Sequence, residues 1–153
     1  MTDGDVLSTP GHLVSVAARG FARLSELRLR PLGFGPGYLP VLIALRDRRA
    51  DTQRDLARAL RIGQPPMAQM LARMERDGLV TRVPDPQDGR SRKIALTSKA
   101  EGGLPAAITV LTEGNRAALA DFTEEESRLF VSMVDRVIAN LDRMANDDGR
   151  AEN

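Results

Sequence analysis

The sequence predicts a mainly α-helical protein with one small β-hairpin. Aromatic residues make up only 3% of the chain and Trp is absent, so the core has to be built from Leu, Val, Ile, Met and Ala, a set that favours helices. Apolar residues recur at helical spacing along most of the 153 residues. Only between residues 79 and 97 do they alternate with polar ones, on either side of a polar turn, which is the pattern of a hairpin.

The N-terminal part predicts one long helix and one short helix. Thr9 is placed to cap the long helix, with Pro10 at its first position. Pro31 and the glycine-rich segment 33–37 end that helix. A short helix is then expected over residues 38–46, with Pro40 tolerated in its first turn.

The middle of the chain predicts a pair of short helices joined by a tight turn at residues 61–63. Thr52 and Asp55 are spaced as a capping box that opens the first helix. In the second helix, Pro65 and Pro66 fall in the first turn, and Gly78 supplies a left-handed stop. The predicted buried faces of the pair are Leu56, Ala57, Leu60, Met67, Met70, Leu71 and Met74.

A hairpin with a polar tip at residues 84–90 follows this pair, and two helices follow the hairpin. Ser98 and Glu101 have the spacing of a capping box that opens the first of these helices, which Gly102, Gly103 and Gly114 weaken. Thr123 and the glutamates after it open the last helix.

These elements predict a winged helix-turn-helix at residues 36–98, in which the hairpin is the wing. Residues 8–35 and 99–146 carry apolar stripes too long for the winged helix to cover, so we expect them to be dimerisation helices, with a polar tail at 147–153. Charge is divided in the same way. Residues 46–99 hold thirteen Arg and Lys against seven Asp and Glu, and residues 100–153 hold five against eleven. A basic middle segment favours double-stranded DNA as the partner.

The predicted DNA contacts lie on the helix pair and the wing. A Gln side chain pairs with adenine and an Arg with guanine in the major groove, and Ala68 offers a contact to a thymine methyl. The N-terminus of the first helix of the pair offers N–H groups to a phosphate. A basic wing enters the minor groove, and Asp88 is expected to brace the Arg90 guanidinium. The predicted contact residues are Thr52, Gln53, Gln64, Pro65, Ala68, Gln69, Arg73, Arg90, Arg92 and Lys93.

Other classes of function are disfavoured by what the sequence lacks. With no Cys and a single His, the chain offers no disulfide, no thiolate or multi-histidine metal site, and no nucleophile–base set, so we expect neither an enzyme nor a cofactor. No run of 18 apolar residues marks a membrane span, and a cytoplasmic protein is expected. The alternative to DNA binding is a winged helix that only contacts proteins.

Residues 52–97 resemble the MarR family of multiple-antibiotic-resistance-type regulators. The resemblance rests on Gln53, DLARAL at 55–60, MERDGLVTR at 74–82, DPQDGR at 85–90 and LT at 96–97. It implies a triangular homodimer in which each protomer gives one winged helix to half of a palindrome. It also implies a repressor released by a small phenolic or lipophilic ligand. The residues expected to line that ligand site are His12, Val16, Arg19, Tyr38 and Leu42.

Overall fold

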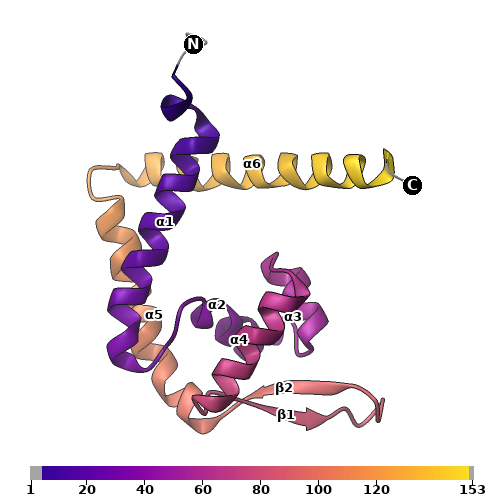
Figure 1. The fold of residues 1–153 in the computed structure, drawn as a ribbon. Helices are drawn as coiled ribbons and strands as arrows, with labels where there is room; N and C mark the ends of the chain where they lie inside the picture. The colour runs from indigo at the N-terminus through magenta and orange to yellow at the C-terminus, as the bar shows by residue number, and fades with distance from the viewer. Residues whose placement is uncertain (1–4, 152–153) are drawn as a thin grey trace. The chain divides into compact units, whose positions relative to one another are not determined.

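The computed structural model describes residues 5–151 and confirms the predicted fold class (Figure 1). Its elements, in chain order, are η1 (Val6–Ser8), α1 (Pro10–Leu29), η2 (Arg30–Leu32), α2 (Tyr38–Arg46), α3 (Gln53–Leu60), α4 (Gln64–Arg76), β1 (Val80–Pro84), β2 (Arg92–Leu96), α5 (Ser98–Ala118) and α6 (Glu124–Ala151). The chain forms two compact units, with the boundary after Asn115. None of the helices in the described part is long and apolar enough to cross a membrane.

Side-chain caps begin the first helices where the sequence predicts them. The Thr9 hydroxyl accepts the His12 N–H at 3.4 Å, and the Thr52 hydroxyl accepts the Asp55 N–H at 3.2 Å. Both caps satisfy an N–H group that the first turn of a helix leaves without an intrahelical partner. The capping residues therefore fix where α1 and α3 start.

Helix α4 ends in a Schellman motif. Gly78 has φ 73°, in the left-handed region that a glycine adopts without strain. The Leu79 N–H donates to the Met74 carbonyl at 2.9 Å, and the Gly78 N–H donates to the Glu75 carbonyl at 3.1 Å. This turn reverses the chain from α4 directly into β1.

Strands β1 and β2 pair antiparallel, from Val80 opposite Leu96 to Pro84 opposite Arg92. The hairpin is fastened to the segment before α3, because the Ile94 N–H donates to the Asp51 carbonyl at 2.7 Å. Ile94 is also buried, so the base of the wing belongs to the core and only its far end extends into solvent.

The core of the first unit lies between the helix pair, α2, the base of the hairpin and the start of α5. Full burial of a Leu or Met side chain contributes about 1.5–3 kcal/mol, so these residues dominate the stability of the winged helix. The largest fully buried side chains are Leu39, Val41, Leu42, Leu56, Met67, Leu71, Met74 and Leu79.

Helix α5 is continuous despite its glycines, which allow close packing. A Cβ on Gly103 would lie 3.0 Å from the Phe34 ring, and one on Gly114 would lie 3.4 Å from Leu24. The cap of α5 corrects the sequence prediction, because the capping side chain is Thr97 and not Ser98. The Thr97 hydroxyl accepts the Ala100 N–H at 3.3 Å and donates to the Gly78 carbonyl at 2.6 Å. It thereby satisfies two backbone groups, whereas Ser98 is exposed.

The second unit contains the last turn of α5 and the whole of α6. A reciprocal capping box opens α6, since the Glu126 carboxylate accepts the Thr123 N–H at 2.7 Å and the Thr123 hydroxyl accepts the Glu126 N–H at 3.1 Å. The Phe122 and Phe130 rings pack edge to face with centroids 6.0 Å apart. Helix α6 continues to Ala151, so the expected polar tail is helical in its described part. No proline interrupts that segment, and a helix satisfies its own backbone without burial.

Candidate nucleic-acid interface

Helix α4 presents a polar face to solvent opposite its methionines. Met67, Met70 and Met74 are buried, and this fixes the rotation of the helix about its axis. The predicted contact residues on the opposite side are exposed, except that Ala68 is half-buried. They are Gln64, Pro65, Gln69 and Arg73.

The N-termini of α3 and α4 meet at a pair of glutamines. Gln53 Nε2 donates to Gln64 Oε1 at 3.2 Å, and both side chains have further amide groups to offer. Thr52, which caps α3, lies beside them and is half-buried. The structure therefore brings together three of the predicted contact residues at one edge of the helix pair.

The wing tip is organised by short-range hydrogen bonds to carboxylates. Asp85 Oδ1 accepts the Gln87 N–H at 2.9 Å, and Asp88 Oδ1 accepts the Arg90 N–H at 3.1 Å. The bond that Asp88 makes is thus to the backbone of Arg90, in an Asx-turn, and not to its guanidinium. Both Arg90 and Arg92 are exposed.

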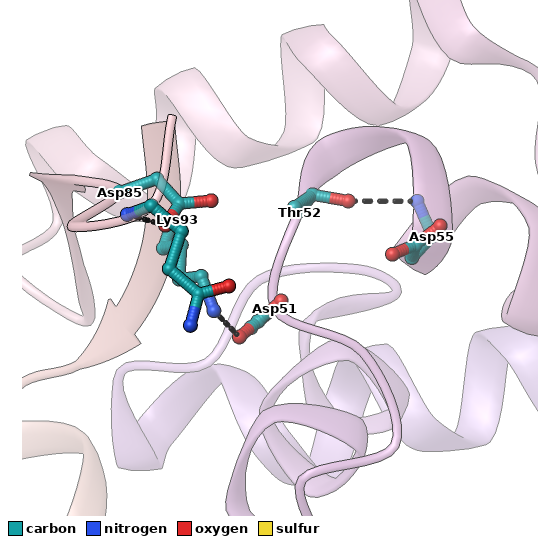
Figure 2. A network of polar contacts seen from close by, with 6 residues as sticks. Asp51, Thr52, Asp55, Asp85 and Lys93 are labelled. Atoms are coloured by element: carbon teal, nitrogen blue, oxygen red, sulfur yellow. Dashed lines mark hydrogen bonds and ion pairs between the residues drawn. The ribbon is translucent and has the colours of Figure 1, made fainter. Parts of the chain in front are cut away.

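Lys93 points back toward the body of the winged helix and not outward. Its Nζ lies 2.9 Å from Asp51 Oδ2, as Figure 2 shows beside the Thr52 cap. The hydrogen bond and charge of Asp51, with the charge of Asp85, raise the pKa of Lys93. Lys93 therefore holds the wing against the segment before α3, and its charge is partly compensated. Sequence reasoning missed Asp51, because nothing local links it to a lysine 42 residues away.

Further cations surround this face. Arg54 and Arg58 on α3 and Arg76 on α4 are exposed, and sequence reasoning did not include them. Arg82 on β1 pairs with Glu75 at 3.2 Å. These exposed arginines add to the positive charge of the helix pair.

A cavity of about 210 Å³ lies in the same unit, between α1, the segment before α2, the start of α2 and α5. None of the five residues expected to line a ligand site lines it: Tyr38 and Leu42 are buried, and His12, Val16 and Arg19 belong to the first half of α1. The glycine- and proline-rich segment 33–37, which the sequence predicts as the end of a helix, also forms part of the cavity wall. The lining residues are Ala22, Ser25, Glu26, Leu29, Gly35, Pro36, Gly37, Leu39, Pro40 and Leu111.

Metal-ligating side chains do not gather in the described part of the chain, where no group of three or more His, Cys, Asp or Glu residues is placed to hold an ion. The chemistry available at this surface is hydrogen bonding by amides and charge attraction by guanidinium groups. These are the interactions by which proteins bind base edges and phosphates.

A solvent-facing recognition helix beside a basic wing defines a winged helix-turn-helix DNA-binding protein. The MarR family profile matches residues 32–91. The transcriptional regulator HosA of Escherichia coli O111:H- is 36% identical over 98 residues, which cover 64% of this chain and 73% of HosA. The crystal structure of transcriptional regulator PA3341 is similar with a TM-score of 0.74 at 29% identity, over 87% of this chain and 98% of that one. A mutant MarR of E. coli complexed with operator DNA has the same fold, with a TM-score of 0.79 at 21% identity, over 87% and 98% of the two chains.

This chain belongs to the MarR family and is a transcriptional regulator.

Proposed function

We propose that this protein is a ligand-responsive repressor that binds a palindromic operator as a homodimer, without a cofactor. The observation that carries the DNA-binding part is the exposed face of α4, with Gln64, Gln69 and Arg73, next to a wing on which Arg90 and Arg92 are exposed. The mutant MarR of E. coli, which has the same fold, was solved in complex with operator DNA. That complex supports binding of operator DNA by this protein.

Selection of bound sequences from random duplex tests this part. We expect a palindromic site whose half-sites are about 10 base pairs apart, centre to centre, because two-fold symmetric helices enter successive major grooves. Affinity should fall steeply with salt concentration as counterions are released. A winged helix that serves only protein contacts would show neither an enriched site nor a steep salt dependence.

The homodimer is supported by apolar surface that the described chain leaves uncovered. No described side chain of α6 is buried, although this helix of 28 residues has a stripe of large apolar side chains. Helix α1 buries only Leu29 and exposes roughly half of Leu13, Val14 and Val16. Apolar surface of this extent marks an interface in a folded protein. The exposed stripe of α6 comprises Phe130, Met133, Val137, Leu141 and Met144.

The ligand response is supported by the cavity of about 210 Å³ between α1, the segment before α2 and α5. An apolar cavity of about 150 Å³ is large enough to bind benzene, so this one has room for a small lipophilic molecule. Its only charged lining residue is Glu26, which pairs with Arg30. Arg30, whose side chain is 70% exposed, compensates this carboxylate only in part, and the cavity lining includes no basic residue to pair with an anionic occupant. We therefore propose a neutral phenol or other neutral lipophile as the effector class.

Octanol and octanoate form a matched pair of neutral and anionic probes of equal chain length. We expect octanol to bind by calorimetry and to weaken operator binding roughly 5- to 150-fold, the usual range of allosteric coupling. Octanoate should bind more weakly, and Glu26→Gln should reduce the difference between the probes. Equal binding of the two probes by the parent protein would contradict the charge argument.

A further inference from the structure

The wall of the cavity is in direct contact with two side chains that lead to the recognition helix. Gly35 and Gly37 line the cavity. A Cβ on Gly35 would lie 2.8 Å from Cζ of Tyr38, and one on Gly37 would lie 2.9 Å from Cε of Met70 in α4. The backbone of the wall is therefore packed against the tyrosine ring and the methionine methyl, with no room to move toward either.

The opposite side of the wall segment is also closed. Phe34 is buried, and its ring lies so close to Gly103 of α5 that a Cβ there would come within 3.0 Å. If a molecule in the cavity pushes the wall outward, α5 blocks movement on the side of Phe34. The other neighbours of the wall are Tyr38 and Met70. Displacement of the wall has to be taken up by these side chains.

Tyr38 connects the wall to the end of α4. It is the first residue of α2 and is only 2% exposed. Its hydroxyl donates to Asp77 Oδ2 at 2.8 Å, and Asp77 is the C-cap of α4. Burial, followed by the hydrogen bond to Asp77, raises the pKa of Tyr38, while the neighbouring Arg73 guanidinium lowers it. Lys99 Nζ donates to the Asp77 carbonyl at 2.8 Å, so this end of α4 is held by polar contacts from both α2 and α5.

We propose that Tyr38 is a positioning residue that transmits displacement of the cavity wall to the recognition helix through its hydrogen bond to Asp77. Tyr38 is buried and is not one of the residues that line the cavity. Its ring rests on Gly35, and its hydroxyl sets the position of the end of α4. A ligand that binds with the wall displaced then disfavours the DNA-binding position of α4, which is the unequal binding that regulation requires. This inference rests on the proposed ligand response in one respect, namely that a bound ligand is what displaces the cavity wall.

A test without ligand uses Gly35→Ala, which places a methyl group against the tyrosine ring and so displaces it. We expect operator affinity to fall at least about fivefold, the lower end of typical coupling. Tyr38→Phe, which lacks the hydroxyl, should itself lose operator affinity, and Gly35→Ala added to it should cause little further loss. Gly102→Ala is the matched control, because a Cβ there meets nothing within 4 Å, and its operator affinity should equal that of the parent.

The protein also contains its own spectroscopic probe of this contact. Tyr38 is the only tyrosine and there is no Trp, so ultraviolet emission reports on this one side chain. A phenol that donates to a carboxylate is quenched, and we expect Gly35→Ala and Asp77→Ala to increase the emission in the absence of DNA. Asp77→Asn keeps an acceptor oxygen and should restore most of the operator affinity that Asp77→Ala loses.

A double-mutant cycle keeps the proposal testable if Gly35→Ala does not fold. Tyr38→Phe and Asp77→Ala should each reduce the effect of octanol on operator binding by a similar factor. The double variant should reduce that effect by no more than either single variant does. Octanol should bind Tyr38→Phe as tightly as the parent while releasing less DNA. Additive losses, or undiminished release of DNA from Tyr38→Phe, would overturn the role of Tyr38. If octanol does not bind the parent, the proposed ligand response fails, and the cycle is then scored on the emission and operator affinity of the variants alone.

Discussion

Val137→Asp should convert the protein to a monomer and abolish tight operator binding. Val137 lies in the middle of the apolar stripe of α6 and is 45% exposed in the described chain, so the substitution leaves no cavity within the protomer. In the proposed dimer it would bury a carboxylate without a partner, which an apolar interface does not tolerate. Because joining two half-site contacts raises avidity by roughly 10²–10⁴-fold, we expect operator affinity to fall within that range. Analytical ultracentrifugation and operator titration measure the two effects.

Ala139→Asp is the matched control for this change. Ala139 is also exposed on α6 but lies on the opposite side of the helix from Val137, about 200° around the axis at 3.6 residues per turn. The Ala139→Asp substitution introduces the same charge at nearly the same position along the helix. It should leave the dimer and its operator affinity intact. A Val137→Asp protein that still sediments as a dimer, or a monomeric parent, would contradict the assignment of this stripe to the interface.

Much of the fold was predictable from the sequence because its determinants are local. Thr9, Thr52 and Thr123 each bond an N–H three residues later, and Gly78 closes α4 within its own turn. The exposed face of α4 followed from the spacing of its methionines, since burial of one side of a helix determines the other. Local spacing does not reveal which of two adjacent capping residues is used. Thr97 caps α5 because its hydroxyl also reaches Gly78, which is distant in sequence.

The parts that could not be predicted depend on contacts between distant segments. The basic run that contains Lys93 predicts a DNA contact, whereas the bond from Lys93 to Asp51 is seen only in the folded hairpin. The cavity is formed by α1, the segment before α2, α2 itself and α5, whose relative positions no periodicity specifies. The same is true of the bond between Tyr38 and Asp77, 39 residues apart. Positioning residues are therefore the hardest to predict from this sequence, whereas its helix caps and buried helix faces can be predicted.

Arg90→Ala and Gln69→Ala should both weaken operator binding, but in distinguishable ways. Arg90 is exposed at the wing tip, where a guanidinium meets phosphate or the minor groove. Its removal should lower affinity for operator and unrelated duplex alike and reduce the slope of log affinity against log salt by about one. Gln69 is exposed on α4, where an amide reads a base edge, so its removal should cost about 1–3 kcal/mol on the preferred site only.

Arg128→Ala controls for the loss of a positive charge on a helix outside the winged helix-turn-helix. Arg128 pairs with Glu124 on α6, and both side chains are largely exposed, so the pair adds little to stability. Its substitution should leave the salt slope unchanged. Titrations of the variants on operator and on a scrambled duplex, each over a salt series, separate the two roles. If Arg90→Ala matched the parent at every salt concentration, the wing would not contact DNA. If Gln69→Ala lost the same factor on both duplexes, α4 would be bound to the backbone, and the specificity of this regulator would have to come from the shape of its operator.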